Sequence, residues 1–152
     1  MNLESLYESF KDISANLRNN EDKKNISIKA HNFILSSLNN IPEIIGYISQ
    51  EKNKLIFLKN VKKGYILIFN HLDGVRNITS NINVGSIYGI YEYDVENDKI
   101  LSIFETGYVL YGPATILVKT CINKVKLYYL DNTNTFEYIR CIRCLTEGKL
   151  KS

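Results

Sequence analysis

The residues with the clearest chemical potential lie in the segment FNHLDGVRNITSNINVGSIYGIYEYD, from Phe69 to Asp94. An apolar run there ends in a carboxylate and a tight turn, Asp73–Gly74. A strand that delivers an acid into a glycine turn is a common way to hold a metal ion together with a phosphate. A paired-acid site would place a second carboxylate nearby, but the position three residues before Asp73 is the amide Asn70. The segment is therefore a catalytic loop, a former catalytic loop or only a polar turn.

Taken alone, these residue types favour a structural turn. Asp-Gly is among the commonest turn dipeptides. His71 is a single histidine near a strand end, a position that is more often satisfied locally than catalytic, and Glu51 follows a strand-like run where it is able to face water. The glycines between residues 85 and 112 suggest close backbone approaches within a sheet, because they match neither a dinucleotide nor a Walker pattern.

The cysteines indicate neither a disulfide framework nor a complete metal site. Cys121, Cys141 and Cys144 are an odd number and cannot all pair within one chain. The spacing Cys141-x-x-Cys144 is half of a zinc or redox motif, but the chain has only one such pair, and His31 and His71 are far away in sequence. We expect ordinary reduced thiols.

Length and composition predict one globular domain spanning residues 1–152. The chain is 45% hydrophobic and 23% charged, and its size is sufficient to bury a core. The net charge of +3 is small and the basic residues are dispersed, so no nucleic-acid partner is predicted. There is neither a secretory signal pattern nor an apolar run of about 18 residues, so no membrane association is predicted and a cytoplasmic location is expected.

The hydrophobic periodicity predicts helices first and strands afterwards. Apolar residues recur at helical spacing over 3–18, and a second helix is expected over 28–39, before Pro42. Strands are expected over 44–49, 54–59, 64–69, 86–93, 114–120, 124–130 and 136–143, with turns at 61–64, 94–99 and 131–135. A run of helices followed by a run of strands indicates an α+β fold.

The order of these segments resembles class 1 fructose-1,6-bisphosphatase, one of the lithium-sensitive, magnesium-dependent phosphatases. The family's metal loop DPLDGSSNID and its next strand VSVGTIFGIYR are similar to NHLDGVRNIT (70–79) and INVGSIYGIYE (82–92). Its segment GYALYGSATMLV is similar to GYVLYGPATILV (107–118). The resemblance covers nearly the whole of this chain but only the first half of the sequence of a family member. It implies amino-terminal helices packed on a mostly antiparallel multi-stranded sheet, in a hydrolase family of carbohydrate metabolism.

The resemblance implies a magnesium site made of an acidic pair, two loop acids and a distant glutamate. The acidic pair falls on Gln50 and Glu51, the loop acids fall on Asn70 and Asp73, and the carbonyl of Leu72 is a further weak ligand. Two carboxylates are thus replaced by amides, which keep the shape and lose the charge, and the distant glutamate has no counterpart. We expect weak magnesium binding or none, with Asp73 and Glu51 as remnants of the catalytic site.

The family's phosphate-binding segment corresponds to Gly74, Val75, Arg76 and Asn77. In the family a serine pair offers hydroxyl and backbone N–H groups to the phosphate, whereas Val75 and Arg76 have no hydroxyl. The last acid of the loop is Thr79 here. Gly74 and Asn77 are expected to preserve the turn, so the loop is interpreted as a former catalytic loop that keeps its fold.

The family also binds AMP between an amino-terminal helix and the neighbouring sheet, and the helix over 3–18 takes the place of that helix in the resemblance. Tyr65 matches a position that contacts the nucleotide. The basic residue that ends the family's GIYR strand is Glu92 here, so its charge is opposite to the one that attracts phosphate. We expect the nucleotide site to be lost.

Two functions remain open at this point. The first is a truncated, catalytically inactive fructose-1,6-bisphosphatase-like domain that acts through assembly, as a homo-oligomer or with a partner subunit, or by binding a sugar phosphate. The second is a magnesium-dependent fructose-1,6-bisphosphate 1-phosphatase of gluconeogenesis, active alone or completed by a second polypeptide. In the family a second half of the chain covers sheet edges and apolar faces. Because the resemblance does not include that half, we expect self-association through exposed surfaces. The expected contact surfaces are the helix over 3–17 and strands near Tyr88, Tyr91, Tyr128 and Tyr129.

Overall fold

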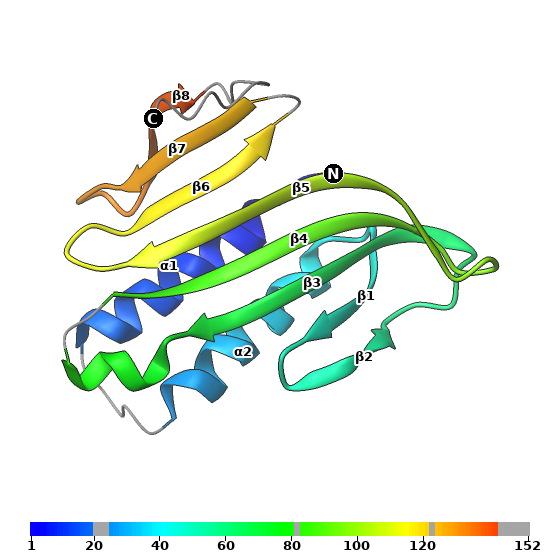
Figure 1. Ribbon diagram of the computed structural model, residues 1–152, viewed down its shortest axis with the longest axis horizontal. Coiled ribbons are helices and arrows are strands. Elements are labelled where there is room, and N and C mark those ends of the chain that lie inside the picture. Colours follow the sequence, from blue (N-terminus) through cyan, green and yellow to red (C-terminus); the bar gives the residue numbers. More distant parts are fainter. Residues whose placement is uncertain (20–24, 81–82, 122–123, 143–152) are drawn as a thin grey trace, which may run out of the picture.

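The computed structural model describes residues 1–19, 25–80, 83–121 and 124–142, which form helices on one mixed sheet (Figure 1). The helical elements are α1 (Glu4–Asn19), α2 (Ile26–Ser37) and the 3₁₀ helices η1 (Leu38–Asn40) and η2 (Val75–Ser80). The strands are β1 (Ile44–Ser49), β2 (Lys52–Phe57), β3 (Lys63–Asp73), β4 (Val84–Asp94), β5 (Lys99–Tyr111), β6 (Ile116–Cys121), β7 (Lys124–Leu130) and β8 (Phe136–Ile142).

The eight strands form one sheet in the order β2-β1-β3-β4-β5-β6-β7-β8. Only β1 and β3 run parallel, and every other neighbouring pair is antiparallel. The reason is connectivity: hairpin connections reverse the chain, whereas after β2 the chain crosses β1, so that β3 lies on the other side of β1 and parallel to it. The predicted α+β fold with a mostly antiparallel sheet is confirmed.

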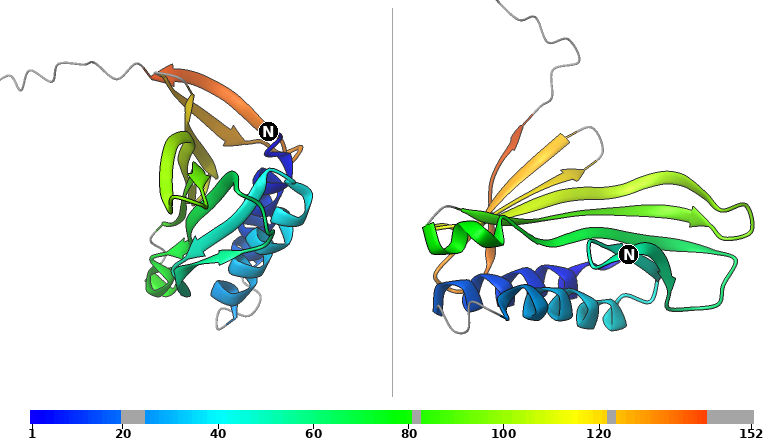
Figure 2. Two further views of the ribbon diagram at one scale, coloured as in Figure 1. Left: turned by 90° about the vertical axis from the view of Figure 1, so that its right-hand side faces the viewer. Right: turned by 60° about the horizontal axis from the view of Figure 1, so that its bottom comes forward.

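Both α-helices lie on the same face of the sheet, which we call the covered face (Figure 2). In α1, Leu6, Phe10 and Ile13 recur at helical spacing and are almost inaccessible to solvent. In α2 the same role falls to Ala30 and Ile34. Within the described chain, neither helix is at once long and apolar enough to cross a membrane.

The sequence missed the longest strand, β5. It predicted a turn over 94–99 and assigned no strand between that turn and residue 114, yet β5 begins at Lys99 and pairs with β4 out to Val84↔Tyr111. Local pattern hides this strand, because Glu105, Thr106 and Gly107 interrupt its apolar run and the partner strand supplies its hydrogen bonds. β2 and β6 are likewise shifted by one or two residues from the expected bounds.

β3 also runs further than expected, to Asp73 instead of residue 69. Asn70 pairs with Ile87 of β4, and Asp73 pairs with Gly85, with a register shift between the two pairs. The bulge lets the strand continue into the predicted turn.

Two of the expected contact surfaces are wrong. The apolar stripe of α1 is buried against the sheet instead of being available to a partner. Tyr88 is buried on the covered face, and Tyr128 is half-buried against the same core. Tyr129 is exposed and Tyr91 is half-buried, and the strand register places both on the opposite face.

Candidate functional site

The carboxyl ends of β1 and β3 bring two of the predicted site residues together. Because Ser49 pairs with Phe69 in the parallel ladder, Gln50 and Asn70 follow at the same level of neighbouring strands. Both line an open concavity of about 780 Å³. The Oδ1 atom of Asn70 is buried and has no hydrogen-bond partner among the described residues.

The turn after β3 has the geometry that its sequence predicts. Asp73 is exposed at the strand end, while the side chain of Leu72 is buried in the core. Gly74 has a φ of 76°, a left-handed conformation that favours glycine. Val75 and Arg76 then open the 3₁₀ helix η2. The side chains of Asn77 and Thr79 lie outside the described part of the chain.

Glu51 is directed toward His71, which the sequence analysis expected to be satisfied locally and not catalytic. The Nε2 atom of His71 lies 2.8 Å from Oγ of Ser27 and 3.8 Å from Oε1 of Glu51. His71 is buried, whereas more than half of the Glu51 side chain is exposed. Since serine and acid share Nε2, this is not a catalytic triad, in which the acid would hold Nδ1.

A second histidine lies beside the first. The rings of His31 on α2 and His71 on β3 are 5.1 Å apart at an angle of 36°. Burial lowers the pKa of both, and the neighbouring His31 lowers the pKa of His71 further, while Glu51 acts in the opposite direction. The Nδ1 atom of His71 is buried without a partner in the described chain, so the expectation of a locally satisfied histidine holds for Nε2 alone. Two neutral rings therefore pack where α2 meets the sheet.

The residues present do not fit a magnesium site of the family's kind. Magnesium prefers several oxygen ligands in octahedral order and relies on carboxylates. Two of the implied positions are amides, and Glu51 faces His71. Across the described residues, no group of three or more His, Cys, Asp or Glu side chains is placed to hold a metal ion.

The residues implied for nucleotide binding are neighbours. Tyr65 of β3 pairs with Glu92 of β4, and the ring of Tyr65 makes an edge contact with Phe104, with centroids 5.4 Å apart. Glu92 forms an ion pair with Lys63 at 2.8 Å and accepts a hydrogen bond from Ser102 at 2.8 Å. The hydrogen bond from Lys63, and to a smaller extent that from Ser102, lowers the pKa of Glu92. The carboxylate is therefore charged at neutral pH.

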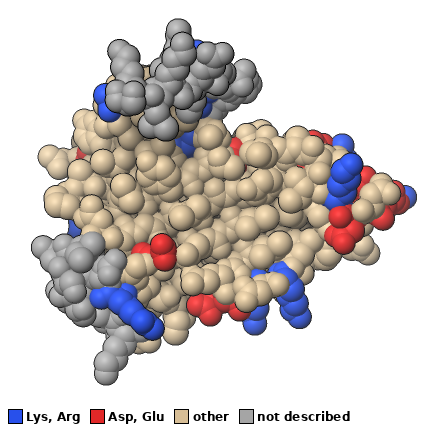
Figure 3. All heavy atoms as spheres, in the orientation of Figure 1, with Lys and Arg blue, Asp and Glu red and all other residues tan. Residues whose placement is uncertain are grey.

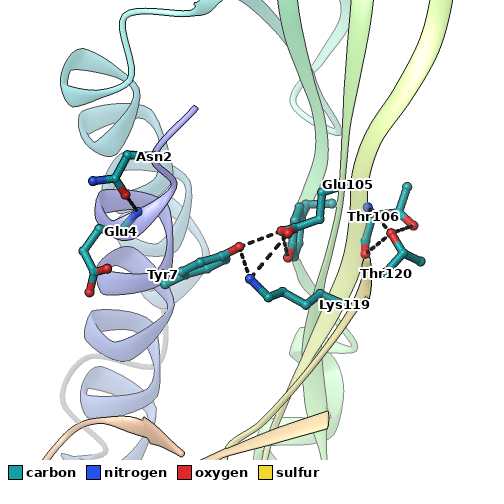
Figure 4. Close-up of polar contacts among 8 residues, drawn as sticks. Asn2, Glu4, Tyr7, Glu105, Thr106, Lys119 and Thr120 are labelled. Atoms are coloured by element: carbon teal, nitrogen blue, oxygen red, sulfur yellow. Dashed lines mark hydrogen bonds and ion pairs between the residues drawn. The ribbon is translucent and has the colours of Figure 1, made fainter. Parts of the chain in front are cut away.

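A buried polar cluster under α1 was missed entirely by sequence reasoning (Figure 4). The hydroxyls of Tyr7 and Tyr88 donate to Oε1 of Glu105 at 2.7 and 2.8 Å. Nζ of Lys119 lies 3.4 Å from Oε2 of Glu105 and donates to the hydroxyl of Tyr7. Burial first, and then the charge of Glu105, raises the pKa of both tyrosines, so both stay protonated and donate. The cluster ties α1 to β4, β5 and β6, and its only sequence signal was a carboxylate inside an apolar strand.

Of the three cysteines, the structure describes the thiol of one, Cys141. Cys141 is a free, half-buried cysteine in β8. The side chain of Cys121 and the whole of Cys144 lie outside the described residues, so the expectation of reduced thiols at those positions stays a prediction.

Comparison with known protein families identifies the family to which this chain belongs. The family described as fructose-1-6-bisphosphatase, N-terminal domain, matches residues 11–142. The chain belongs to the fructose-1,6-bisphosphatase family. Among its relatives, the class 1 fructose-1,6-bisphosphatase of Helicobacter hepaticus is 27% identical over 127 residues, which are 84% of this chain and 44% of that protein. The class 1 enzyme of Neisseria meningitidis serogroup A is 35% identical over 124 residues, covering 76% of this chain and 38% of that protein.

Solved structures agree with this family. Leishmania major fructose-1,6-bisphosphatase in its holo form superposes with a TM-score of 0.78 at 26% identity, over 90% of this chain and 48% of that chain. Its apo form gives a TM-score of 0.77. Two helices on an eight-stranded mixed sheet are thus the fold of a fructose-1,6-bisphosphatase amino-terminal domain. This chain spans less than half the length of the relatives that it matches.

Proposed function

We propose that residues 1–152 are a single, catalytically silent fructose-1,6-bisphosphatase-like domain that acts in the cytoplasm by assembling with other subunits. One observation supports this most directly: Gln50 and Asn70 stand side by side at the carboxyl ends of β1 and β3, where the family pattern has carboxylates. An amide keeps the shape of a carboxylate but provides no charge to balance a metal ion.

The remaining groups do not compensate for this loss. Glu51 lies near His71, and Val75 and Arg76 provide no hydroxyl for a phosphate. Each oriented electrostatic partner removed from an active site typically costs about 10²- to 10³-fold in rate. Several such losses together leave magnesium bound weakly at most and leave hydrolysis at background.

The alternative is a magnesium-dependent phosphatase that acts on fructose 1,6-bisphosphate, alone or once a second polypeptide completes it. The observation that favours this is family membership, because the fructose-1-6-bisphosphatase N-terminal domain family matches residues 11–142. Asp73 remains exposed at the strand end, where it is accessible to a metal-bound sugar phosphate.

Release of phosphate from fructose 1,6-bisphosphate in the presence of magnesium separates these functions. We expect no release above background from the purified chain, and the Helicobacter hepaticus enzyme serves as the positive control. Calorimetry should show that the double variant Gln50→Glu, Asn70→Asp binds magnesium more tightly than the wild type without gaining turnover. A wild-type turnover of about 1 per second, an ordinary enzymatic value, would show that the domain is not silent.

A further inference from the structure

The face of the sheet opposite the helices, which we call the open face, is apolar across its middle. Figure 3 views the molecule from this side, and the charged side chains described there gather at the ends and borders of the face. Several large side chains on it are exposed: Ile87, Tyr108, Leu110 and Tyr129. Isolated exposed hydrophobic residues are ordinary, but a contiguous patch of them marks an interaction surface.

Strand register arranges part of this face as a ridge. Ile87 of β4 pairs with Tyr108 of β5, and Tyr108 pairs with Val118 of β6. Side chains that are paired across strands project from the same face. Ile87 is 55% exposed and Tyr108 is 41% exposed, so both protrude from the sheet.

A trough runs beside the ridge, one pleat further along the strands. Its floor consists of small side chains, because Gly89 of β4 pairs with Thr106 of β5, and Thr106 is hydrogen-bonded to Thr120 of β6. Figure 4 shows both threonines on the side of the sheet away from Tyr7. These residues and the ridge line the same concavity of about 780 Å³.

The ring of Tyr91 closes one end of the trough. A Cβ atom added to Gly89 would lie only 2.6 Å from the Tyr91 ring and hydroxyl, so the ring lies across this glycine. The trough is therefore bounded by Tyr91 at one end and by the ridge along its side. Lys119 is the charged residue among the described lining residues, and its side chain is directed to Glu105 on the covered face.

The open face approaches the size of a specific interface. Strands are spaced by about 4.8 Å and rise about 3.4 Å per residue, so six strands by about seven residues span roughly 24 by 24 Å. That is a flat area on the order of 600 Å², which side-chain relief increases, and stable complexes bury about 800 Å² per partner.

We propose that the open face joins two copies of this chain, packed sheet on sheet with the ridge of each copy in the trough of the other. A ridge and a trough that lie side by side on one surface are self-complementary under a two-fold axis, as an isologous interface requires. Sheets pack face to face at about 10 Å with interdigitating side chains. Each copy carries a net charge of +3, but the uncharged middle lets the faces meet without burying charge.

This inference rests on the proposed assembly and names its surface, and sedimentation velocity at micromolar concentration tests it. We expect the wild type to sediment at twice the chain mass of 17.5 kDa. Ile87→Lys should weaken association at least tenfold. Ile28→Lys is the matched control, because Ile28 is 61% exposed on α2, away from the open face. Tyr108→Lys repeats the test on the ridge if circular dichroism shows that Ile87→Lys does not fold.

The outcomes separate the interface from the proposed function. Dimers of wild-type affinity in both ridge variants would overturn the interface while leaving assembly in place. A wild type that stays at 17.5 kDa over a wide concentration range would overturn the interface and the assembly together. Phosphate release tests catalytic silence in a separate assay, so the interface and the silence of the domain fail independently.

Discussion

Neighbouring residues of β4 show how differently the two faces of the sheet are built. Tyr88 is 3% exposed and packs 5.4 Å from the ring of Phe10 on the covered face, whereas Ile87 is 55% exposed on the open face. Successive side chains of a strand point to opposite faces, so one stretch of sequence supplies both surfaces. The apolar alternation that normally marks one buried face is therefore blurred in β4, where both faces are apolar.

Polar groups distinguish the faces further. The covered face buries an ion pair, Glu105 with Lys119, and the hydroxyl of Tyr7 donates to the same carboxylate. The trough of the open face holds the neutral pair Thr106 and Thr120. A buried charge is tolerated only where fixed partners satisfy it, and α1 provides such a partner. The open face has neutral groups, which cost less to desolvate when another sheet covers them.

The largest effect should come from the covered core. We expect Phe10→Ala to reduce the free energy of unfolding by about 3–5 kcal/mol, because a fully buried ring leaves a cavity. Ile87→Ala on the open face should cost less than about 1 kcal/mol when urea unfolding is measured at concentrations where the chain is monomeric. Equal losses at the two positions would contradict the contrast between the faces.

The buried ion pair should give the next largest effect. Lys119→Met leaves Glu105 buried without its cation, and we expect a loss of about 3 kcal/mol in the free energy of unfolding. Lys63→Met removes the largely exposed partner of Glu92 and should lower the free energy of unfolding far less, because solvent screens an exposed ion pair. If Lys119→Met matched this surface control, the cluster under α1 would not hold the helix to the sheet.

The smallest effect should appear with pH at the histidine pair. Burial lowers the pKa of His71 and of His31 below the ordinary 6.5, so the unfolded chain takes up protons before the folded one. The free energy of unfolding should therefore be highest above pH 6.5 and fall as the pH drops from there through the lowered folded-state values. Urea unfolding of His71→Asn should show a shallower decline between pH 7.5 and 5. A slope as steep as that of the wild type would mean that His71 does not contribute to it.

Elements with a strong local pattern were predictable from sequence. The helix expected over 3–18 is α1 (Glu4–Asn19), because its apolar stripe has helical period and continues without a break. The turn at Asp73–Gly74 was also expected, and the φ of 76° at Gly74 is the conformation that glycine permits. β5 was not predicted, because its length is set by hydrogen bonding to β4 and a short stretch of sequence carries no information about that pairing.

The candidate site divides in the same way. Similarity of motifs predicts that Gln50 and Asn70 stand where the family has acids, and this prediction depends on residue type alone. The register of two parallel strands then placed them at one level. The contact of Ser27 and Glu51 with His71 was not predictable, because the three residues come from α2, the turn between β1 and β2, and β3.

The sequence by itself determined the family and the class of fold, because these follow from residue types in a fixed order. Only the tertiary structure decided which side of each strand the helices cover. That choice depends on the packing of α1 and α2 on Phe69, Tyr88 and Val109, which are distant in sequence from both helices. It left Ile87 and Tyr108 exposed on the open face, whereas Ile66 and Tyr93 on that face are buried in a smaller second cluster.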